Sequence, residues 1–495
     1  MEHVEFIDQT IRDGQQSLWG LRMRAHQATP ALSNLDRTGF RVIDSTGAGM
    51  VTVLLRTFKD DPWAAMDHIV AGMPNTEKRS ATRTVAVGGM GFAPDCLVDL
   101  WIQLLVRHGI GSIWLFDCSF DMPTMKRVSD VVVAAGGKPV PTVMYGLTSV
   151  HDDAFFASKA AEMASWNGVE TVELEDAAGV LTVERASTLL PAVVNAVGSM
   201  PLELHCHATT GMAPAVYVEG LKAGVRIFHT ASRPMANGPS LPATEGLIAN
   251  LKALGYSHGL DESLLDPVAA HFIATAESLG GTKNGYDLGV PREFLLAPYG
   301  HQLPGGMTGS LKSQLAQYGM LDQLDAVLDE IPRVRRDLGE PIMATPFSQF
   351  VGIQAVLNVV TGDRYSLVPD EVIQYVLGHF GPLYQAADPA VMDRIMSSPR
   401  AKQFVGWVRP QPSLEEIRGT LGRHLSDEEL LLRALHSGEE VDAMLAQKPN
   451  RIDPRYQSNT VVQHVEQLVA ESQSMRSVSV NTPEMSVTLR RNGAA

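Results

Sequence analysis

The sequence has few cysteines and no long apolar run, and both shortages exclude classes of protein. Its 495 residues include only three cysteines, which follow no regular spacing: Cys96, Cys118 and Cys206. A disulfide framework is therefore not expected, and a reducing compartment is favoured. Glycine, proline or charged residues interrupt every apolar stretch, so none is long enough to cross a bilayer. The acidic N-terminal segment has no basic region before an apolar one; we therefore expect no signal peptide and predict a cytoplasmic protein.

Basic residues are also scarce relative to acidic ones. The chain has 40 Lys and Arg residues against 55 Asp and Glu, a formal net charge of −15 at pH 7. That charge repels phosphate backbones and argues against nucleic acid as a partner. The rest of the composition is ordinary for a soluble protein, with 45% apolar residues. The length suits a large barrel plus an additional domain.

Short β-rich runs alternate with longer amphipathic segments through the first half of the chain. Eight strand–helix units in fewer than about 260 residues match the number and size of a closed (β/α)8 TIM barrel, whereas a doubly wound open sheet would be unusually large. No Gly-rich nucleotide fingerprint follows the first strand. The predicted strands are Val4–Thr10, Arg41–Thr46, Arg83–Gly89, Ser112–Ser119, Pro139–Gly146, Thr171–Asp176, Leu202–Thr209 and Val225–Ser232.

Strand signals fade from about residue 290, and helical patterns take their place. We therefore predict a barrel over residues 1–290, a mostly helical domain over 291–447 that completes the active-site funnel, and a linker and tail over 448–495. The helices predicted in the second domain include Leu311–Tyr318, Leu321–Leu338 and Gln349–Thr361.

Two histidines stand two residues apart in the seventh predicted strand. His205 and His207 therefore point to the same side, toward the barrel interior near its C-terminal mouth. A His-x-His pair on a strand is a weak signal by itself, but barrel enzymes place their chemistry at this mouth. The pair is consistent either with hydrogen-bonded core histidines or with a metal site.

Acidic residues at two other strand ends strengthen the metal interpretation. Arg12 and Asp13 follow the first strand, where they can supply an anion-binding group and a metal ligand or can form a surface ion pair beside a turn. Glu173 and Glu175 alternate onto one face of the sixth strand, and two acids inside a barrel need a cation or a proton. Two imidazoles with one or two carboxylates suit Zn²⁺, Mn²⁺ or Co²⁺.

Several spaced segments resemble a known barrel family. They run in order between about residues 4 and 400 and are similar to the carboxyltransferase barrel of pyruvate carboxylase, the oxaloacetate decarboxylase α subunit and the metal-containing subunit of transcarboxylase. The segments are Asp-Gln-Thr-Ile-Arg-Asp-Gly-Gln-Gln-Ser at 8–17, His-Gln-Leu-Pro-Gly-Gly-Met at 301–307 and Thr-Pro-Phe-Ser-Gln-Phe-Val-Gly-Ile-Gln at 345–354.

The resemblance implies roles for individual residues. The family's metal ligands are matched by Asp13, His205 and His207. Arg12 and Gln16 match residues that hold a 2-oxo acid, and Arg83 matches an arginine near the substrate and biotin. Asp117 ends the fourth strand as in the family, and it can line the substrate pocket or cap the next helix. A homodimer is expected by the same resemblance.

The departures from the family pattern lie around the expected pocket. Glu175 stands where the family has a carbamylated lysine as fourth metal ligand, and we predict that this shorter carboxylate acts on the metal site. Thr52 replaces an aspartate and Met90 a tyrosine, and Ala208 stands where an aspartate follows the second histidine. Together these changes indicate a different small-molecule substrate, or chemistry without biotin.

Biotin, if used, is expected on another protein. The one Met-Lys pair, Met125–Lys126, continues with arginine in a helical pattern and does not resemble a biotin attachment site. The tail has an amphipathic run at Thr460–Ser472 and two short alternating runs, Ser477–Val480 and Met485–Arg490. It is similar to the segment before the biotinyl domain of carrier proteins, so it can dock a biotin carrier or carboxylase, or it can simply pack on its own barrel.

Three hypotheses remain from the sequence. The first is a carboxyltransferase subunit that moves or removes CO₂ at the carbon next to a carbonyl, through an enolate, with biotin on a separate carrier. The second is a biotin-independent decarboxylase, aldolase-type lyase or Claisen-type enzyme of the same superfamily. The third is a non-catalytic subunit of a complex, which the retained Asp13, His205 and His207 make the weakest of the three.

Overall fold

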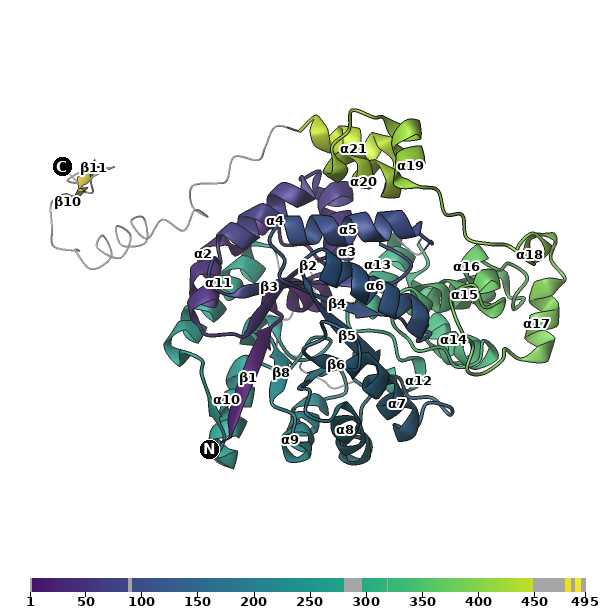
Figure 1. Ribbon diagram of the computed structural model, residues 1–495, viewed down its shortest axis with the longest axis horizontal. Coiled ribbons are helices and arrows are strands. Elements are labelled where there is room, and N and C mark those ends of the chain that lie inside the picture. The colour runs from purple at the N-terminus through teal and green to yellow at the C-terminus, as the bar shows by residue number, and fades with distance from the viewer. Residues whose placement is uncertain are drawn as a thin grey trace.

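The barrel predicted from the sequence is confirmed. The computed structural model describes residues 2–87, 91–279, 296–317, 319–447, 477–481 and 486–490. Eight parallel strands pair in sequence order, and β8 pairs with β1 to close the barrel (Figure 1). The strands are β1 (His3–Asp8), β2 (Val42–Gly47), β3 (Glu77–Arg83), β4 (Ser112–Phe116), β5 (Lys138–Met144), β6 (Val172–Asp176), β7 (Leu202–Cys206) and β8 (Ile227–Thr230). A two-residue strand, β9 (Ser257–His258), extends the pairing of β1.

Amphipathic helices cover the outside of the barrel. They pack apolar stripes on the strands and close one continuous core. Their bounds are α2 (Ala25–Arg37), α4 (Pro62–Ala71), α5 (Asp95–Arg107), α6 (Met122–Ala134), α7 (Asp153–Ala164), α8 (Val183–Val197), α9 (Ala213–Ala223), α10 (Thr244–Leu254) and α11 (Leu265–Ser278). Shorter turns at the barrel mouth are η1 (Thr10–Gly14), α1 (Gln15–Trp19), α3 (Ala48–Val53) and η2 (Leu54–Phe58).

The inward face of the barrel is unusually polar. Strands β6 and β7 are buried along their whole length, with Leu174 and Leu204 in the apolar core. The alternate positions of these strands face the barrel interior and carry Glu173, Glu175, Glu203 and His205. Buried charges of this kind require partners, and the interior supplies one for Glu203, the guanidinium of Arg79.

The third strand was predicted in the wrong place. The sequence favoured Arg83–Gly89, an apolar and β-branched run, but β3 spans Glu77–Arg83. Its residues resemble a solvated surface because they include Lys78 and Arg79, yet both side chains are buried. The ammonium of Lys78 donates to the carbonyl oxygens of residues 73 and 76, and the Arg79 guanidinium pairs with Glu203 across the barrel. Tertiary partners therefore override the surface-like composition.

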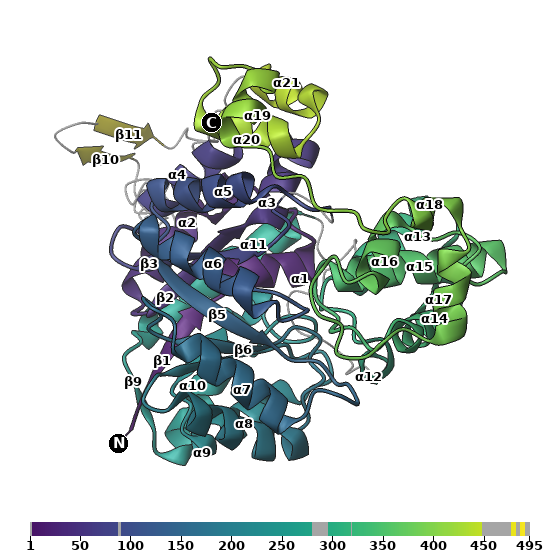
Figure 2. The ribbon, with the colours of Figure 1, turned by 45° about the vertical axis from the view of Figure 1, so that its right-hand side comes forward.

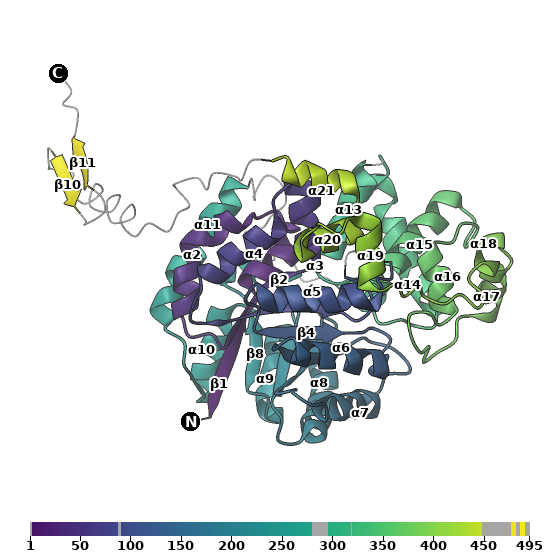
Figure 3. The same cartoon turned by 45° about the horizontal axis from the view of Figure 1, so that its top comes forward.

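The helices predicted after the barrel occupy two places. Helices α12 to α18 stand beside the barrel mouth, whereas α19 to α21 pack on the barrel's outer helices (Figures 1 and 2). Figure 3 also separates α20 from α17 and α18. The bounds are α12 (Pro298–His301), α13 (Met307–Gln317), α14 (Leu324–Asp337), α15 (Phe347–Thr361), α16 (Asp370–Val376), α17 (Pro389–Met396), α18 (Pro399–Lys402), α19 (Leu414–Leu421), α20 (Asp427–Leu435) and α21 (Gly438–Leu445).

Salt bridges attach α20 and α21 to the barrel. Arg107 of α5 lies 3.0 Å from Asp427 of α20, and Arg56 of η2 lies 3.1 Å from Glu440 of α21. The proposed single helical domain over 291–447 thus contains a funnel-forming part, α12 to α18, and a part that packs on the outer face of the barrel.

The tail forms a β-hairpin where two strands were predicted. Strands β10 (Ser477–Asn481) and β11 (Ser486–Arg490) pair antiparallel in continuous register. The predicted helix Thr460–Ser472 lies outside the described residues. Among the helices that the structure does describe, none has the length and apolar character needed to span a membrane.

Candidate metal centre and active-site cavity

Three predicted metal ligands meet at the C-terminal mouth of the barrel. Asp13 lies in the π-helical turn η1 after β1, His205 near the end of β7, and His207 one residue beyond that strand. The carboxylate of Asp13 lies 3.6 Å from Nε2 of His205 and 3.5 Å from Nε2 of His207. One ligand atom from each residue falls within 4.8 Å of the others. The three side chains therefore converge, and their role as metal ligands stays a prediction.

Neighbouring groups orient two of the three ligands. Nδ1 of His207 donates to the carbonyl oxygen of Pro239 at 2.5 Å, which leaves Nε2 free to bind a cation. The hydroxyl of Ser17 donates to Asp13 at 2.6 Å. Burial alone would raise the pKa of Asp13, but the charges of Arg12 and His207 hold it well below its usual range. The result is an ionised carboxylate facing two imidazole nitrogens.

This donor set fits a divalent metal. Burial, reinforced by the charge of neighbouring His229, lowers the pKa of His205 well below its usual value, so its imidazole is neutral, as a metal ligand must be. One carboxylate and two imidazoles are a common set for Zn²⁺, Mn²⁺ or Co²⁺.

The barrel interior also has more carboxylates than cations. Burial and then the charge of Glu173 raise the pKa of Glu175 well above its usual value. One Glu175 carboxylate oxygen and both Glu173 oxygens have no hydrogen-bond partner among the described residues. A bound divalent cation would offset this excess. The buried carboxylates near the ligands include Asp13, Asp44, Glu173, Glu175 and Glu203, and the guanidinium groups of Arg12 and Arg79 lie among them.

Glu175 faces the same cavity as Asp13 and His207 but stands apart from the ligand group. It is not one of the residues whose ligand atoms lie within 4.8 Å of one another. The carboxylate of glutamate is shorter than a carbamylated lysine, which accounts for its greater distance. Its proposed action on the metal stays a prediction.

We expect Glu175→Gln to stabilise the metal-free protein by about 1–2 kcal/mol near pH 8. A buried acid whose pKa is raised takes up protons on folding, so its ionisation costs stability above its ordinary pKa of 4.5 and costs nothing below it. Urea unfolding of metal-free wild type and variant at pH 8 and pH 5 measures the difference, which should shrink at the lower pH. Glu170→Gln, at an exposed position, is the control and should change little. A loss of stability at pH 8 would contradict the assignment.

A cavity of about 990 Å³ opens in front of the ligands. Residues after β1 and β2 and the end of β3 line one side of it, and residues of α13 and α15 line it as well. Five residues predicted from the sequence line it together with Asp13 and His207, namely Arg12, Gln16, Thr52, Arg83 and Glu175. The helical wall is mostly apolar, with Leu311, Leu315, Ile353 and Val356.

Two arginines present guanidinium groups to this cavity. Arg12 is held by Asp44 at 2.8 Å and by Asp13 at 2.9 Å, and its remaining Nη2 has no described partner. The side chain of Arg83 makes no hydrogen bond or ion pair with the described residues, and burial lowers the pKa of its guanidinium to about 10. Both groups remain charged at neutral pH. They can therefore bind anionic groups of a substrate.

Two other predicted pocket residues have different outcomes. Asp117 is not among the residues that line the cavity; it accepts hydrogen bonds from Thr84 and from the backbone and hydroxyl of Ser119. It thus shapes the turn after β4, while Asp121 caps the next helix. Met90 lies outside the described residues.

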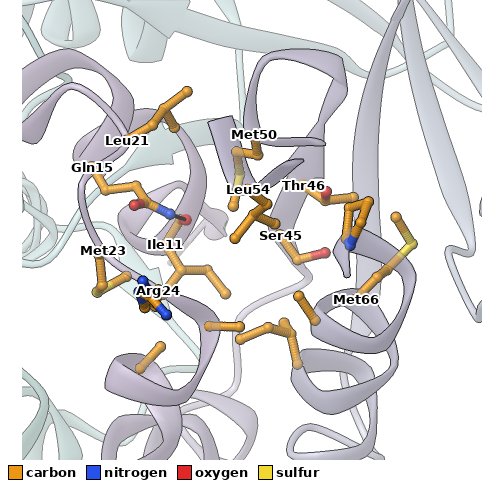
Figure 4. Close-up of a pocket in the computed structure, with 15 residues that line it drawn as sticks. Ile11, Gln15, Leu21, Met23, Arg24, Ser45, Thr46, Met50, Leu54 and Met66 are labelled. Atoms are coloured by element: carbon orange, nitrogen blue, oxygen red, sulfur yellow. Dashed lines mark hydrogen bonds between the residues drawn. The ribbon is translucent and has the colours of Figure 1, made fainter. Parts of the chain in front are cut away.

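A second, much smaller cavity of about 30 Å³ lies behind η1 (Figure 4). Ile11 and Gln15 point toward it, whereas Arg12 and Asp13 line the large cavity. Its remaining walls are mainly apolar and include Met50 of α3. It has room for little more than one water, so the chemistry belongs to the larger cavity.

The Pro-Gly-Gly turn at 304–306 closes over the ligands. An added Cβ at Gly305 would lie 1.9 Å from the carbonyl oxygen of Pro239 and 2.9 Å from Nδ1 of His207, the two atoms of the orienting hydrogen bond. A Cβ at Gly306 would lie 2.8 Å from the carbonyl oxygen of Gln16. Glycine is required here because no side chain fits between the turn and the metal-binding residues.

We expect Gly305→Ala to weaken metal binding by about 10–100-fold, because it displaces the group that orients His207. Competition between the protein and a metal-binding dye measures the affinity. Gly352→Ala is the matched control, since Gly352 lines the same cavity but its added Cβ would have no neighbour within 4 Å. Equal affinities for the two variants would contradict the role given to the turn.

Sequence reasoning missed a row of buried residues below the ligands. Arg79, Glu203, His229 and Gln9 point into the barrel interior and contact one another. A period of two, counted back along β7 from His207 through His205, would have identified Glu203. Arg79 was missed because β3 was predicted at Arg83–Gly89, which leaves Arg79 outside the strand, and His229 is the only histidine of its predicted strand.

The fold and the site define the protein's class: a TIM-barrel enzyme with a candidate metal centre and a large cavity, lined by Arg12 and Arg83, at the barrel mouth. Residues 119–270 match the family profile described as HMGL-like, and residues 299–488 match the one described as a conserved carboxylase domain. The chain belongs to the carboxyltransferase family of biotin-dependent carboxylases, whose members form or cleave carbon–carbon bonds.

Individual relatives support this assignment. A pyruvate carboxylase subunit of Methanocaldococcus jannaschii is 32% identical over 393 residues, which cover 79% of this chain and 68% of that protein. The 2-oxoglutarate carboxylase large subunit of Hydrogenobacter thermophilus is 30% identical over 459 residues, which cover 91% of this chain and 70% of that protein. The solved carboxyl transferase domain of Rhizobium etli pyruvate carboxylase matches with a TM-score of 0.78 and 22% identity over 91% of this chain and 78% of that one, which shows the shared fold.

Proposed function

We propose that this chain is the carboxyltransferase subunit of a biotin-dependent carboxylase that acts on a 2-oxo acid. The observation that carries the proposal is the convergence of Asp13, His205 and His207 beside a cavity into which Arg12 and Arg83 present guanidinium groups. Two of its relatives are named as carboxylases of pyruvate and of 2-oxoglutarate. Both compounds are 2-oxo acids, and we propose one of this class as the substrate.

The three ligands would hold a divalent ion, Zn²⁺, Mn²⁺ or Co²⁺, that supplies Lewis acidity to the substrate's carbonyl oxygen. Nη2 of Arg12 and the amide of Gln16 would bind the carboxylate next to that carbonyl. Arg83 would balance the charge of the carboxyl group in transfer. The apolar wall of α13 and α15 would exclude water from the reacting carbon.

In the decarboxylating direction, the bond between carbon 3 and its carboxyl group breaks and leaves its electron pair as an enolate. The released CO₂ forms a bond with a nitrogen of biotin, and the proton from that nitrogen returns to carbon 3. We propose that biotin arrives on a separate carrier protein, that a biotin carboxylase subunit completes the complex, and that the chain works as a homodimer in the cytoplasm.

A carboxyl-exchange assay tests the proposal. The purified chain, loaded with Zn²⁺, Mn²⁺ or Co²⁺, is incubated with a 3-carboxy-2-oxo acid such as oxaloacetate and with free biotin or a biotinylated carrier. We expect release of the 2-oxo acid to depend on biotin and to stop when avidin is added. Turnover that ignores avidin would instead support a biotin-independent decarboxylase or lyase. Absence of metal binding even in excess metal would leave a non-catalytic subunit.

A further inference from the structure

His229 of β8 contacts one of the proposed metal ligands from below. Its Nδ1 lies 3.1 Å from Nδ1 of His205, and both rings are fully buried. The other nitrogen of His229, Nε2, lies 3.0 Å from the carboxylate of Glu203. That carboxylate accepts two hydrogen bonds from Arg79, at 2.5 and 3.1 Å. A row of four buried side chains therefore runs from Arg79 to the metal site.

The donors and acceptors along this row fix the position of each proton. Arg79 is a donor only. Burial would raise the pKa of Glu203, but the charge of Arg79 lowers it to about 2. Glu203 is therefore an ionised acceptor. Nε2 of His229 must then carry the proton that it donates to Glu203. With that proton on Nε2, Nδ1 of His229 is the ring atom placed to accept the Nδ1 proton of His205. The lone pair of His205 is thereby placed on Nε2, the atom that faces Asp13.

We propose that His229 is a positioning residue for the metal centre, which selects the metal-binding tautomer of His205 by accepting its Nδ1 proton. His205 needs such a partner because it has no carbonyl acceptor like the Pro239 oxygen that orients His207. The inference rests on the proposed metal centre but not on the proposed substrate.

Glu173 does not provide this hydrogen bond. One of its oxygens lies 3.3 Å from Nδ1 of His205, but neither oxygen makes a hydrogen bond with a described residue. The side-chain amide of Gln9 lies 3.0 Å from Nδ1 of His229 on the side of β1, so it shares that acceptor with His205. His229 is therefore the hydrogen-bond acceptor placed to fix His205.

Glu173, His205 and His229 also form a group with metal-ligand spacing. If a second cation bound there, Nδ1 of His205 would be a ligand instead of a donor. The number of metal ions bound per chain therefore distinguishes the two arrangements.

Two substitutions at one position test the inference. His229→Asn keeps a carbonyl acceptor near the place of Nδ1, whereas His229→Leu removes it; both lose the bond to Glu203, so their difference isolates the contact with His205. The readouts are the Zn²⁺ dissociation constant, by competition with a metal-binding dye, and the visible absorption spectrum of the Co²⁺ form. Thermal melting of the metal-free variants reports folding.

We expect His229→Leu to bind Zn²⁺ about 10–100-fold more weakly and to alter the Co²⁺ spectrum, and His229→Asn to stay within about threefold of wild type. His151→Leu is the matched control, because it removes another buried histidine that lies among aromatic rings and outside the ligand group; it should cost stability but not affinity.

Equal Zn²⁺ affinity and equal Co²⁺ spectra for folded wild type and His229→Leu would overturn the positioning role, and so would two metal ions per wild-type chain. Failure of the wild type to bind metal would instead refute the metal centre itself. Failure of carboxyl exchange with metal binding intact would refute the proposed reaction and leave the role of His229 standing.

Discussion

His207→Ala is expected to reduce carboxyl exchange by at least about 10³-fold, because it removes a ligand of the proposed metal centre. A metal that stabilises developing negative charge contributes several kcal/mol to a reaction of this kind, and each 1.36 kcal/mol corresponds to about tenfold in rate. Asp13 would keep its contacts with Arg12 and Ser17, so the metal-free fold should persist. Exchange rates and the metal content of the purified variant measure the effect together.

The matched control is His271→Ala. A ring nitrogen of His271 also forms a hydrogen bond with a backbone carbonyl oxygen, that of Gln27, at 2.6 Å. His271 lies on α11, outside the ligand group. It should retain metal and exchange activity. A His207→Ala protein that still binds one metal per chain and still catalyses exchange would show that the cation, if any, binds elsewhere.

Arg83→Met is expected to reduce kcat/KM for the 2-oxo acid by about 10²–10³-fold, because it removes a preorganised cation from the reaction cavity. The same change should leave the free energy of unfolding unchanged or raise it by up to about 1 kcal/mol, since the guanidinium has no described partner in the folded protein. Loss of activity without loss of stability is the pattern of a residue retained for function.

Arg335→Met provides the contrast. Burial lowers the pKa of Arg335 to about 10, as it does for Arg83, but its guanidinium donates to the carbonyl oxygens of Pro341 and Leu147 at 3.1 and 2.7 Å. We expect this variant to lose about 2–3 kcal/mol of stability. Steady-state kinetics and urea unfolding of both variants show whether Arg83 serves activity or stability. If Arg83→Met unfolds as easily as Arg335→Met while keeping its activity, Arg83 is structural.

Hydrophobic periodicity predicted most of the barrel because seven of the eight strands are apolar or β-branched runs bounded by turns. It failed at β3, where Lys78 and Arg79 look like surface residues until their partners are known. It assigned residues 291–447 to one domain, a division that stays a prediction, and it could not say which surface each helix covers, because amphipathic helices give no sign of that. Arg107 and Arg56, which anchor α20 and α21, are unremarkable in the sequence.

Local sequence was sufficient to predict that His205 and His207 point to the same side of their strand, since residues two apart on a strand share a face. It also placed Asp13 correctly, because the end of β1 opens on the same mouth as the end of β7. Glu175 could be placed inside the barrel, but its distance from the other ligands depends on the closure of the whole sheet.

The sequence by itself thus determined the barrel, the family and the three side chains that converge at its mouth, because these follow from short-range periodicity and motif spacing. Only the tertiary structure decided that Gly305 leaves just enough room beside His207 and that Arg79, Glu203 and His229 meet beneath His205. Those contacts join separate strands and loops, with Arg79 and Glu203 124 residues apart, and their register is set by barrel closure and not by local preference.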